Sequence, residues 1–177
     1  MARERQIFLT TDTHFFHEKI KEYCNRPDDC EEKIIKNWKH YINEKDIVFH
    51  LGDVIFGNKI QLTNILKQLP GTKVLIKGNH DRHSDNWYID AGFVIVCKRI
   101  RVKKFVLSHA PVSLKDRNLI NIHGHFHNNP KKRWEQKMQK ILTKNHYLLS
   151  LETTDYKPIL LIDAIEKKLV QKSLSIE

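Results

Sequence analysis

Short runs of apolar residues recur along the chain, and each run ends in polar residues. Five of these runs have the length and the β-branched or aromatic content that are typical of buried β-strands. They lie at residues 7–11, 47–51, 74–77, 105–108 and 119–122. We therefore expect these segments to be strands inside the protein.

Between these early runs, the apolar positions take the three- and four-residue spacing of an amphipathic helix. Ile34 and Trp38 share one face of the first such stretch, and Asp28 is a candidate cap at its start. Residues 60–69 form a second stretch and residues 87–91 a third, shorter one. Alternation of strands and helices in this half of the chain favours a largely parallel sheet covered by helices.

From residue 93 onward, short turns separate the expected strands, which predicts antiparallel pairing of neighbouring segments. Strands are expected at 93–96, 100–102, 105–108, 147–151 and 159–162, and a terminal helix at 164–172. Together the elements predict an α/β fold in which two sheets pack face to face and are flanked by helices.

The length of 177 residues suits one domain with a sizeable core, so we expect residues 1–177 to form a single domain. The longest apolar run, residues 93–97, is far shorter than the ~20 residues of a membrane helix. The N-terminus also lacks the apolar stretch of a secretory signal. We therefore expect a cytoplasmic protein with no membrane partner. Its three cysteines lack CxxC spacing, which argues against disulfides and zinc-thiolate sites.

The formal net charge of +10 is concentrated in two segments. Residues 98–104 contribute five cations and no acid, and residues 131–144 contribute six cations against Glu135. Such clusters suit a polyanionic partner, because binding releases counterions. Solvated lysine-rich faces explain the same composition equally well, so basicity alone leaves the partner open. The polar and basic segment 128–145 is a candidate insertion or arm.

Residues with metal-binding chemistry gather where the predicted strands end. In α/β sheets the loops beyond the carboxyl ends of the strands converge, and ligands bind there. The polar residues at these ends are Asp12, His14, Asp53, Asn79, His80, His109, His125 and His127. A single histidine is more often a core residue than a ligand, but this many together predict a metal site. Carboxylate, imidazole and amide donors without a thiolate suit divalent Mn, Fe, Zn, Co or Ni.

The spacing within two of these groups also favours a common site. Asp12 and His14 are two residues apart, as are His125 and His127. In an extended backbone, side chains two residues apart point to the same side. Each pair is therefore expected to converge on one site.

These residues stand in motifs that follow one another along the chain. The motifs are D-x-H at Asp12-Thr13-His14, G-D at Gly52-Asp53, G-N-H-D at Gly78-Asn79-His80-Asp81, an isolated His109, and G-H-x-H at Gly124-His125-Phe126-His127. In this set and order they resemble the calcineurin-like metallophosphoesterase family. The resemblance covers residues 7–127 and, more weakly, 147–165.

The resemblance implies a four-layer α-β-β-α sandwich of two mixed sheets that holds two divalent metal ions, with Mn foremost. One ion would be bound by Asp12, His14, Asp53 and His127, and the other by Asp53, Asn79, His109 and His125. A hydroxide between the ions would attack the phosphate ester, and His80 would assist the leaving oxygen. Asp81 is a candidate to orient His80, while capping or loop closure is a role at least as well supported.

Three further histidines lie outside this set. His17 could line the cleft or cap the following helix, and we slightly favour the cap. His50 lies in the middle of a strand and is expected to be buried beside the ligands rather than to bind metal. His123 precedes the G-H-x-H motif and is a candidate hydrogen-bond partner of a ligand carboxylate.

The predicted function is a metal-dependent hydrolase of phosphate monoesters or diesters, with a small or nucleotide substrate. The alternative is a nuclease, in which the basic segment 131–144 holds DNA or RNA while the metals cut it. A non-catalytic interaction module on the same fold is a third hypothesis, although such a module is expected to lose ligand residues. The ester, the physiological metal and the oligomeric state stay open.

Overall fold

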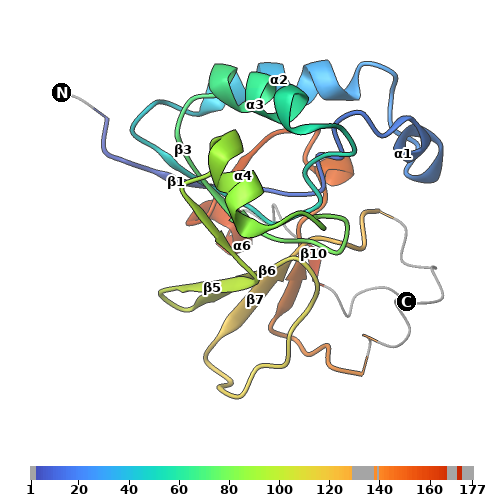
Figure 1. Ribbon diagram of the computed structural model, residues 1–177. Helices are drawn as coiled ribbons and strands as arrows, with labels where there is room; N and C mark the ends of the chain where they lie inside the picture. The colour runs from blue at the N-terminus through green and yellow to red at the C-terminus, as the bar shows by residue number, and fades with distance from the viewer. Residues whose placement is uncertain (1–2, 129–137, 139, 167–170, 173–177) are drawn as a thin grey trace.

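The computed structural model of the protein describes residues 3–128, 138, 140–166 and 171–172. Two five-stranded sheets form its centre (Figure 1). The first sheet has the order β4-β3-β2-β1-β9 and consists of β1 (Ile7–Thr10), β2 (Ile47–His50), β3 (Thr72–Ile76), β4 (Ile95–Cys97) and β9 (Ile159–Leu160). Strands β1 to β4 run parallel, and β9 is antiparallel to β1.

The second sheet is also mixed. Its order is β10-β8-β7-β6-β5, with β5 (Arg99–Val102), β6 (Phe105–Ser108), β7 (Ile120–His123), β8 (His146–Leu148) and β10 (Gln171–Lys172). The three central strands run parallel, whereas β5 and β10 are antiparallel to their neighbours. The prediction of two mixed sheets flanked by helices is therefore confirmed.

Helices cover the outer face of the first sheet, as the ribbon shows for α2, α3 and α4 (Figure 1). The helical elements are α1 (Glu18–Tyr23), α2 (Cys30–Tyr41), α3 (Lys59–Gln68), α4 (Asp85–Ala91), α6 (Asp163–Glu166) and the 3-10 turn η1 (Leu151–Thr153). Trp38 of α2 and Leu62 of α3 pack with Phe8 and Val48 of the sheet. None of the helices in the described part of the chain has the length and apolarity needed to cross a bilayer.

A second apolar cluster lies between the two sheets. Leu9 and Phe49 of the first sheet pack here with Leu107 and Ile122 of the second. Because side chains alternate along a strand, Phe8 faces the helices while Leu9 faces the second sheet. The strands of the first sheet are thus apolar on both faces, which explains why they appear as continuous apolar runs.

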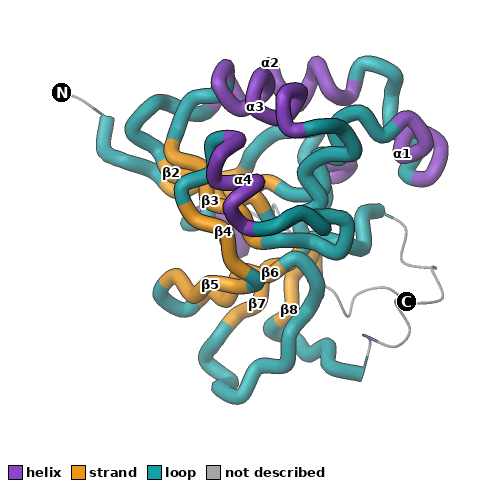
Figure 2. The backbone as a smooth tube through the Cα atoms, viewed as in Figure 1, coloured by secondary structure: helices purple, strands orange, loops and turns teal. Residues whose placement is uncertain are grey.

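The loops that follow the parallel strands of both sheets meet on one side of the molecule. Figure 2 shows the strands in orange and the loops in teal. The amide of Asp12, after β1, donates to Gly52 O, after β2, at 2.9 Å. In the second sheet the amide of Gly124, after β7, donates to His109 O, after β6, at 2.9 Å. The amide of His125 then donates to the Asp12 carboxylate at 3.0 Å, which joins the loops of the two sheets.

Several local predictions are wrong. Helix α2 begins after Asp29 rather than Asp28, because a turn from Pro27 to Cys30 delays its start. Strand β4 is not antiparallel to β5; it joins the first sheet parallel to β3, since the chain crosses between the sheets at Lys98.

The helix predicted at 164–172 is wrong in its second half. Helix α6 covers Asp163–Glu166, and β10 pairs with β8 at the edge of the second sheet. Pairing with β8 satisfies the unpaired backbone N–H and C=O groups of that edge strand. The spacing of apolar residues within 164–172 gives no sign of this pairing. Most of the expected arm at 128–145 lies outside the described residues.

Candidate metal centre

The structure brings all seven candidate ligand residues to one place, at the carboxyl ends of five strands. Asp12 and His14 follow β1, Asp53 follows β2 and Asn79 follows β3 in the first sheet. His109 follows β6, and His125 and His127 follow β7 in the second sheet. Within the described residues, six of these side chains form two groups, and the donor atoms within each group lie within 4.8 Å of one another. The groups are Asp12, His14 and His127, and Asp53, His109 and His125.

The backbone at these residues is unusual. Asp12, His14, Asp53, His125 and His127 have φ angles of 47°, 48°, 56°, 73° and 50°. Residues with a Cβ rarely adopt this left-handed conformation, and it often marks functional sites where the surroundings hold it in place. The extended backbone assumed for the two i, i+2 pairs is therefore wrong, and His125 and His127 fall into different groups.

In the first group, one carboxylate oxygen of Asp12 faces two imidazoles. Asp12 Oδ1 lies 3.9 Å from His14 Nε2 and 3.8 Å from His127 Nε2. The other oxygen, Oδ2, accepts hydrogen bonds from Thr11 Oγ1 and the amide of His125. Burial opposes the charge of Asp12, but the three neighbouring imidazoles of His127, His109 and His14 lower its pKa well below the usual value.

In the second group, His109 is oriented by the backbone. Its Nδ1 donates to Leu51 O at 2.8 Å, which leaves Nε2 as the nitrogen with a lone pair. This Nε2 lies 3.0 Å from Asn79 Oδ1, 2.9 Å from His125 Nδ1 and 3.4 Å from Asp53 Oδ2. Donor atoms from four separate loops thus converge on one point.

Asp53 belongs to the second group and also lies close to the first. Its Oδ2 is 3.8 Å from His14 Nε2 in the first group and 3.4 Å from His109 Nε2 in the second. Its Oδ1 accepts from the amide of His80 at 2.8 Å, which holds the carboxylate in this direction. Burial raises the pKa of Asp53 to about 7, so a cation at Oδ2 would favour its charged form.

The donor set fits divalent cations. Among the described residues, Asp12 Oδ1 and both ring nitrogens of His14 are buried without a hydrogen-bond partner. Buried polar atoms are nearly always paired, because leaving them unpaired is costly. Burial also lowers the pKa of His14, which keeps its ring in the neutral form that binds metals. A cation bound at this group would satisfy Asp12 Oδ1 and one ring nitrogen of His14.

Two residues outside the sequence motifs, Arg26 and Glu152, lie next to His127 and fix its surroundings. Glu152 Oε1, in η1, lies 3.1 Å from His127 Nδ1 and 2.7 Å from Arg26 Nη2. Arg26 also donates to Asp12 O at 2.8 Å and to Thr13 O at 3.2 Å. No local signal marks these residues, and Glu152 lies 126 positions from Arg26. A carboxylate that accepts from one imidazole nitrogen directs the other toward a metal.

The carboxylate of Asp81 accepts hydrogen bonds from backbone amides of neighbouring loops and not from the ring of His80. Its Oδ2 accepts from the amides of Asp53 at 2.7 Å and Gly78 at 2.8 Å, and its Oδ1 accepts from Val54 at 3.1 Å. The geometry therefore favours loop closure over the orientation of His80. His80 itself is exposed beside the centre, with its ring 5.0 Å from that of Phe56.

The remaining histidines surround the centre. His17 stands at the start of α1 but its side chain makes no cap, so the favoured interpretation is wrong; its ring lies 3.9 Å from Phe56 and lines the cleft. His50 is buried, as expected, and accepts from the amide of Gly52 at 3.1 Å. Burial lowers the pKa of His50 to about 4. His123 is buried, with Nδ1 2.9 Å from Gly124 O.

Two cavities adjoin the candidate ligands. One of about 460 Å³ is lined by His14, His17, Tyr23 and His80, among others. The other, of about 540 Å³, has Lys77, Lys98 and His109 in its wall. Asn79 and His125 line both cavities, so open space lies on either side of the centre.

Comparison with known proteins gives one family and several relatives. The family model described as the calcineurin-like phosphoesterase superfamily domain matches residues 6–150. An uncharacterised protein of Methanocaldococcus jannaschii is 34% identical over 97% of both chains. The gene 66 protein of Mycobacterium phage L5 is 30% identical over 68% of this chain and 76% of its own length.

Two solved structures share the fold. A protein of unknown function from Aquifex aeolicus is 28% identical, with a TM-score of 0.70 over 93% of this chain and 100% of its own. The nuclease MPE of Pseudomonas putida is 20% identical, with a TM-score of 0.51 over 70% of this chain and 62% of its own. At that identity the likeness to the nuclease concerns the fold alone.

Proposed function

This chain belongs to the calcineurin-like phosphoesterase superfamily, and on that premise we propose that it hydrolyses phosphate monoesters or diesters with the help of two divalent metal ions. The observation that carries the proposal is the position of Asp53 Oδ2, between the imidazole of His14 and that of His109. A carboxylate in this position can be shared by two cations and reduce their mutual repulsion.

The donor chemistry supports the metal assignment. When bound, two divalent ions would polarise the phosphoryl oxygens and lower the pKa of a coordinated water. Asp12, His14, Asp53 and His127 would hold one ion, and Asp53, Asn79, His109 and His125 the other. Oxygen and nitrogen donors favour Mn, and they also accept Fe, Zn, Co or Ni.

His80 is proposed to assist the leaving group. It follows the candidate ligand Asn79, its amide holds Asp53, and its exposed ring lines the same cavity as His14. Burial and the charge of Arg82 lower the pKa of His80, so the ring is largely neutral at pH 7. A neutral imidazole still carries one N–H that can donate to the departing oxygen.

Turnover of aryl phosphates tests this function. With Mn added, we expect wild type to hydrolyse a bis-aryl phosphate diester or a mono-aryl phosphate, and comparison of the two separates diesterase from monoesterase. His80→Asn should keep two metal ions per chain and lower kcat by ~10²–10⁴-fold. Asp53→Asn is the inactive control. Normal turnover in His80→Asn would remove His80 from the mechanism, and activity in Asp53→Asn would reveal a contaminant.

A nuclease is the second candidate. Asn79 and His80 are exposed, and cavities on both sides of the centre leave room for a chain that continues in two directions. The nuclease of similar fold from Pseudomonas putida is consistent with this candidate. The segment 131–144, expected to hold the nucleic acid, lies mostly outside the described residues. Metal-dependent cleavage of an oligonucleotide, absent in Asp53→Asn, would distinguish a nuclease from an enzyme specific for small esters.

A further inference from the structure

A basic face lies on the second sheet, next to the candidate metal centre. We define it by six exposed cations, which lie just before β5, in β5, in the turn to β6 and in the loop after β6: Lys98, Arg99, Arg101, Lys103, Lys104 and Lys115. No acidic residue occurs between positions 98 and 115. Within the part of the chain that the structure describes, none of the six forms an ion pair. Their charges are therefore not neutralised by neighbouring carboxylates.

Strand β5 presents this charge in a regular array. It is the edge strand of the second sheet, and Arg99 and Arg101 pair with Ser108 and Val106 of β6. Residues two apart on a strand share one side and lie about 6.6 Å from each other. An alternative explanation is that charge on an edge strand prevents aggregation. In that case the cations would need no connection with the metal centre.

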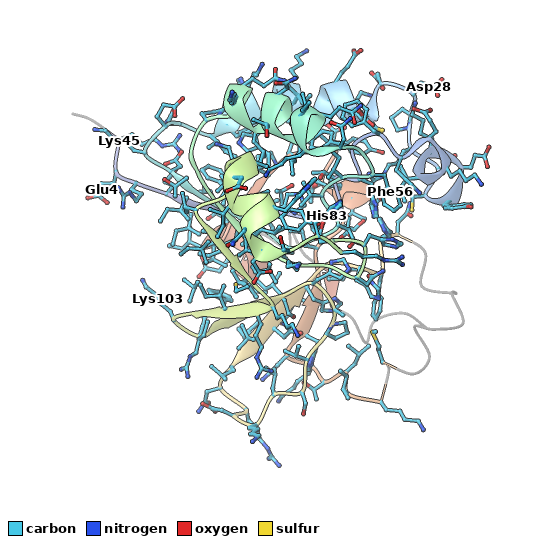
Figure 3. The ribbon with its side chains drawn as sticks, viewed as in Figure 1. Glu4, Asp28, Lys45, Phe56, His83 and Lys103 are labelled. Atoms are coloured by element: carbon cyan, nitrogen blue, oxygen red, sulfur yellow. The ribbon has the colours of Figure 1, made fainter. Side chains whose placement is uncertain are left out.

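The basic face does connect with the centre. Lys98 lines the cavity of about 540 Å³ together with Asn79, His109 and His125. Arg99 pairs with Ser108, the residue before His109. From Lys98 to Lys103, at the tip of the β5–β6 hairpin, the chain extends about 16 Å away from the centre. Figure 3 shows Lys103 on the side of the molecule away from Phe56.

Aromatic rings occupy the other side of the centre. Phe56 is 42% exposed and Tyr23 is 52% exposed. Phe56 is held in place, because its amide donates to Phe15 O at 2.9 Å and its ring contacts His17. Proteins that hold single-stranded nucleic acid combine a positively charged surface, which pairs with phosphates, with exposed rings on which bases stack.

We propose that the basic face and Phe56 bind single-stranded nucleic acid across the candidate metal centre. Arg99 and Arg101 contact phosphates, for which the planar guanidinium is suited. A base stacks on Phe56, beside His80. The proposal extends the nuclease candidate. Cleavage of the bound strand rests on the proposed function, whereas binding of the strand needs no metal and can be tested separately.

Binding is tested on the full chain in EDTA, by fluorescence anisotropy of a labelled 20-nucleotide single strand over a range of salt concentrations. The test variant is Arg99→Gln/Arg101→Gln, and the matched control is Lys36→Gln/Lys67→Gln, which removes two exposed cations from α2 and α3. Loss of two phosphate contacts should make the negative slope of log K against log salt shallower by roughly 1.4, and weaken binding roughly 25-fold at 0.1 M salt. The control should bind as wild type. Phe56→Leu should weaken binding at least about fivefold with an unchanged slope.

The alternatives give different results. Unchanged binding by Arg99→Gln/Arg101→Gln at an unchanged melting temperature would overturn the proposal, as would equal loss in the control. Equal affinity for a hairpin duplex, or for anionic vesicles, would overturn the assignment to single strands. If wild type binds through these residues but hydrolyses no aryl phosphate, the proposed phosphoesterase fails and the binding surface stands. If wild type hydrolyses aryl phosphates but does not bind the single strand, the binding surface fails and the phosphoesterase stands.

Discussion

Glu152→Gln removes one charge from a buried cluster while it keeps the size of the side chain. Glu152 Oε1 contacts Arg26 Nη2 at 2.7 Å and His127 Nδ1 at 3.1 Å, and Oε2 accepts from Ser150 Oγ at 2.5 Å. The side chains of Arg26 and Glu152 are only 0% and 4% exposed. The substitution therefore leaves the guanidinium of Arg26 buried without its counter-charge.

The pKa of Glu152 sets the scale of the effect. Burial alone would raise this pKa, but the hydrogen bond with His127 and the charge of Arg26 lower it from 4.5 to about 2. That depression corresponds to about 3 kcal/mol of unfolding free energy at neutral pH. Removal of one partner from a buried ion pair costs a similar ~3–5 kcal/mol. For a chain of this length the melting temperature should fall by roughly 10 °C.

The pH dependence gives a second, independent readout. Because the folded-state pKa of Glu152 lies below the unfolded value, its contribution is complete above pH 4.5 and is lost as the pH falls toward 2. Urea unfolding in EDTA should show this acid-dependent loss in wild type and a smaller one in Glu152→Gln, where the carboxylate of Asp12 still contributes. Glu44→Gln, at an exposed position, is the control and should behave as wild type.

Metal affinity connects the same residue with the centre. If Glu152 orients His127, Mn titrated calorimetrically should bind Glu152→Gln ~10–100-fold more weakly than wild type. The reasoning is refuted if Glu152→Gln unfolds within about 1 kcal/mol of wild type at pH 7, or if its stability has the wild-type acid dependence. Unchanged Mn affinity in a destabilised variant would limit Glu152 to a structural role.

Three further substitutions address other parts of the molecule. A Cβ at Gly124 would overlap Thr11 Oγ1 and Asp12 Oδ2, so Gly124→Ala should weaken Mn binding by roughly tenfold or more in a titration; wild-type affinity would contradict this. Trp38→Ala empties a buried site and should cost ~3–5 kcal/mol in urea unfolding, with a loss below about 2 kcal/mol counting against the packing described. Asn58→Ala removes the capping box of α3 and should cost about 1 kcal/mol in the same assay, whereas no change would show that the cap is dispensable.

Much of the fold and of the centre can be predicted from local patterns. The apolar runs locate β1, β2, β3, β6 and β7 correctly, because strands buried on both faces appear as unbroken apolar segments. The residues that end these strands are then expected to meet, since parallel strands end on one side of a sheet. Asp12, Asp53 and His109 lie together as that argument requires.

Local patterns are insufficient where long-range pairing decides the conformation. Helical spacing at 164–172 predicts a helix, yet β10 pairs with β8 because an edge strand there has unpaired backbone groups. The left-handed backbone of His14 and His127 is not predicted by local patterns either. Such conformations are unfavourable locally and persist only because surrounding contacts hold them.

The candidate donor atoms, their order along the chain and their position after strands can all be read from the residues alone. The contacts of Arg26 and Glu152 with His127, and the position of Lys98 beside the centre, depend on how the chain packs. Residue type and local spacing are properties of short segments. Contacts such as Arg26 with Glu152, 126 positions apart, form only when packing brings distant segments together.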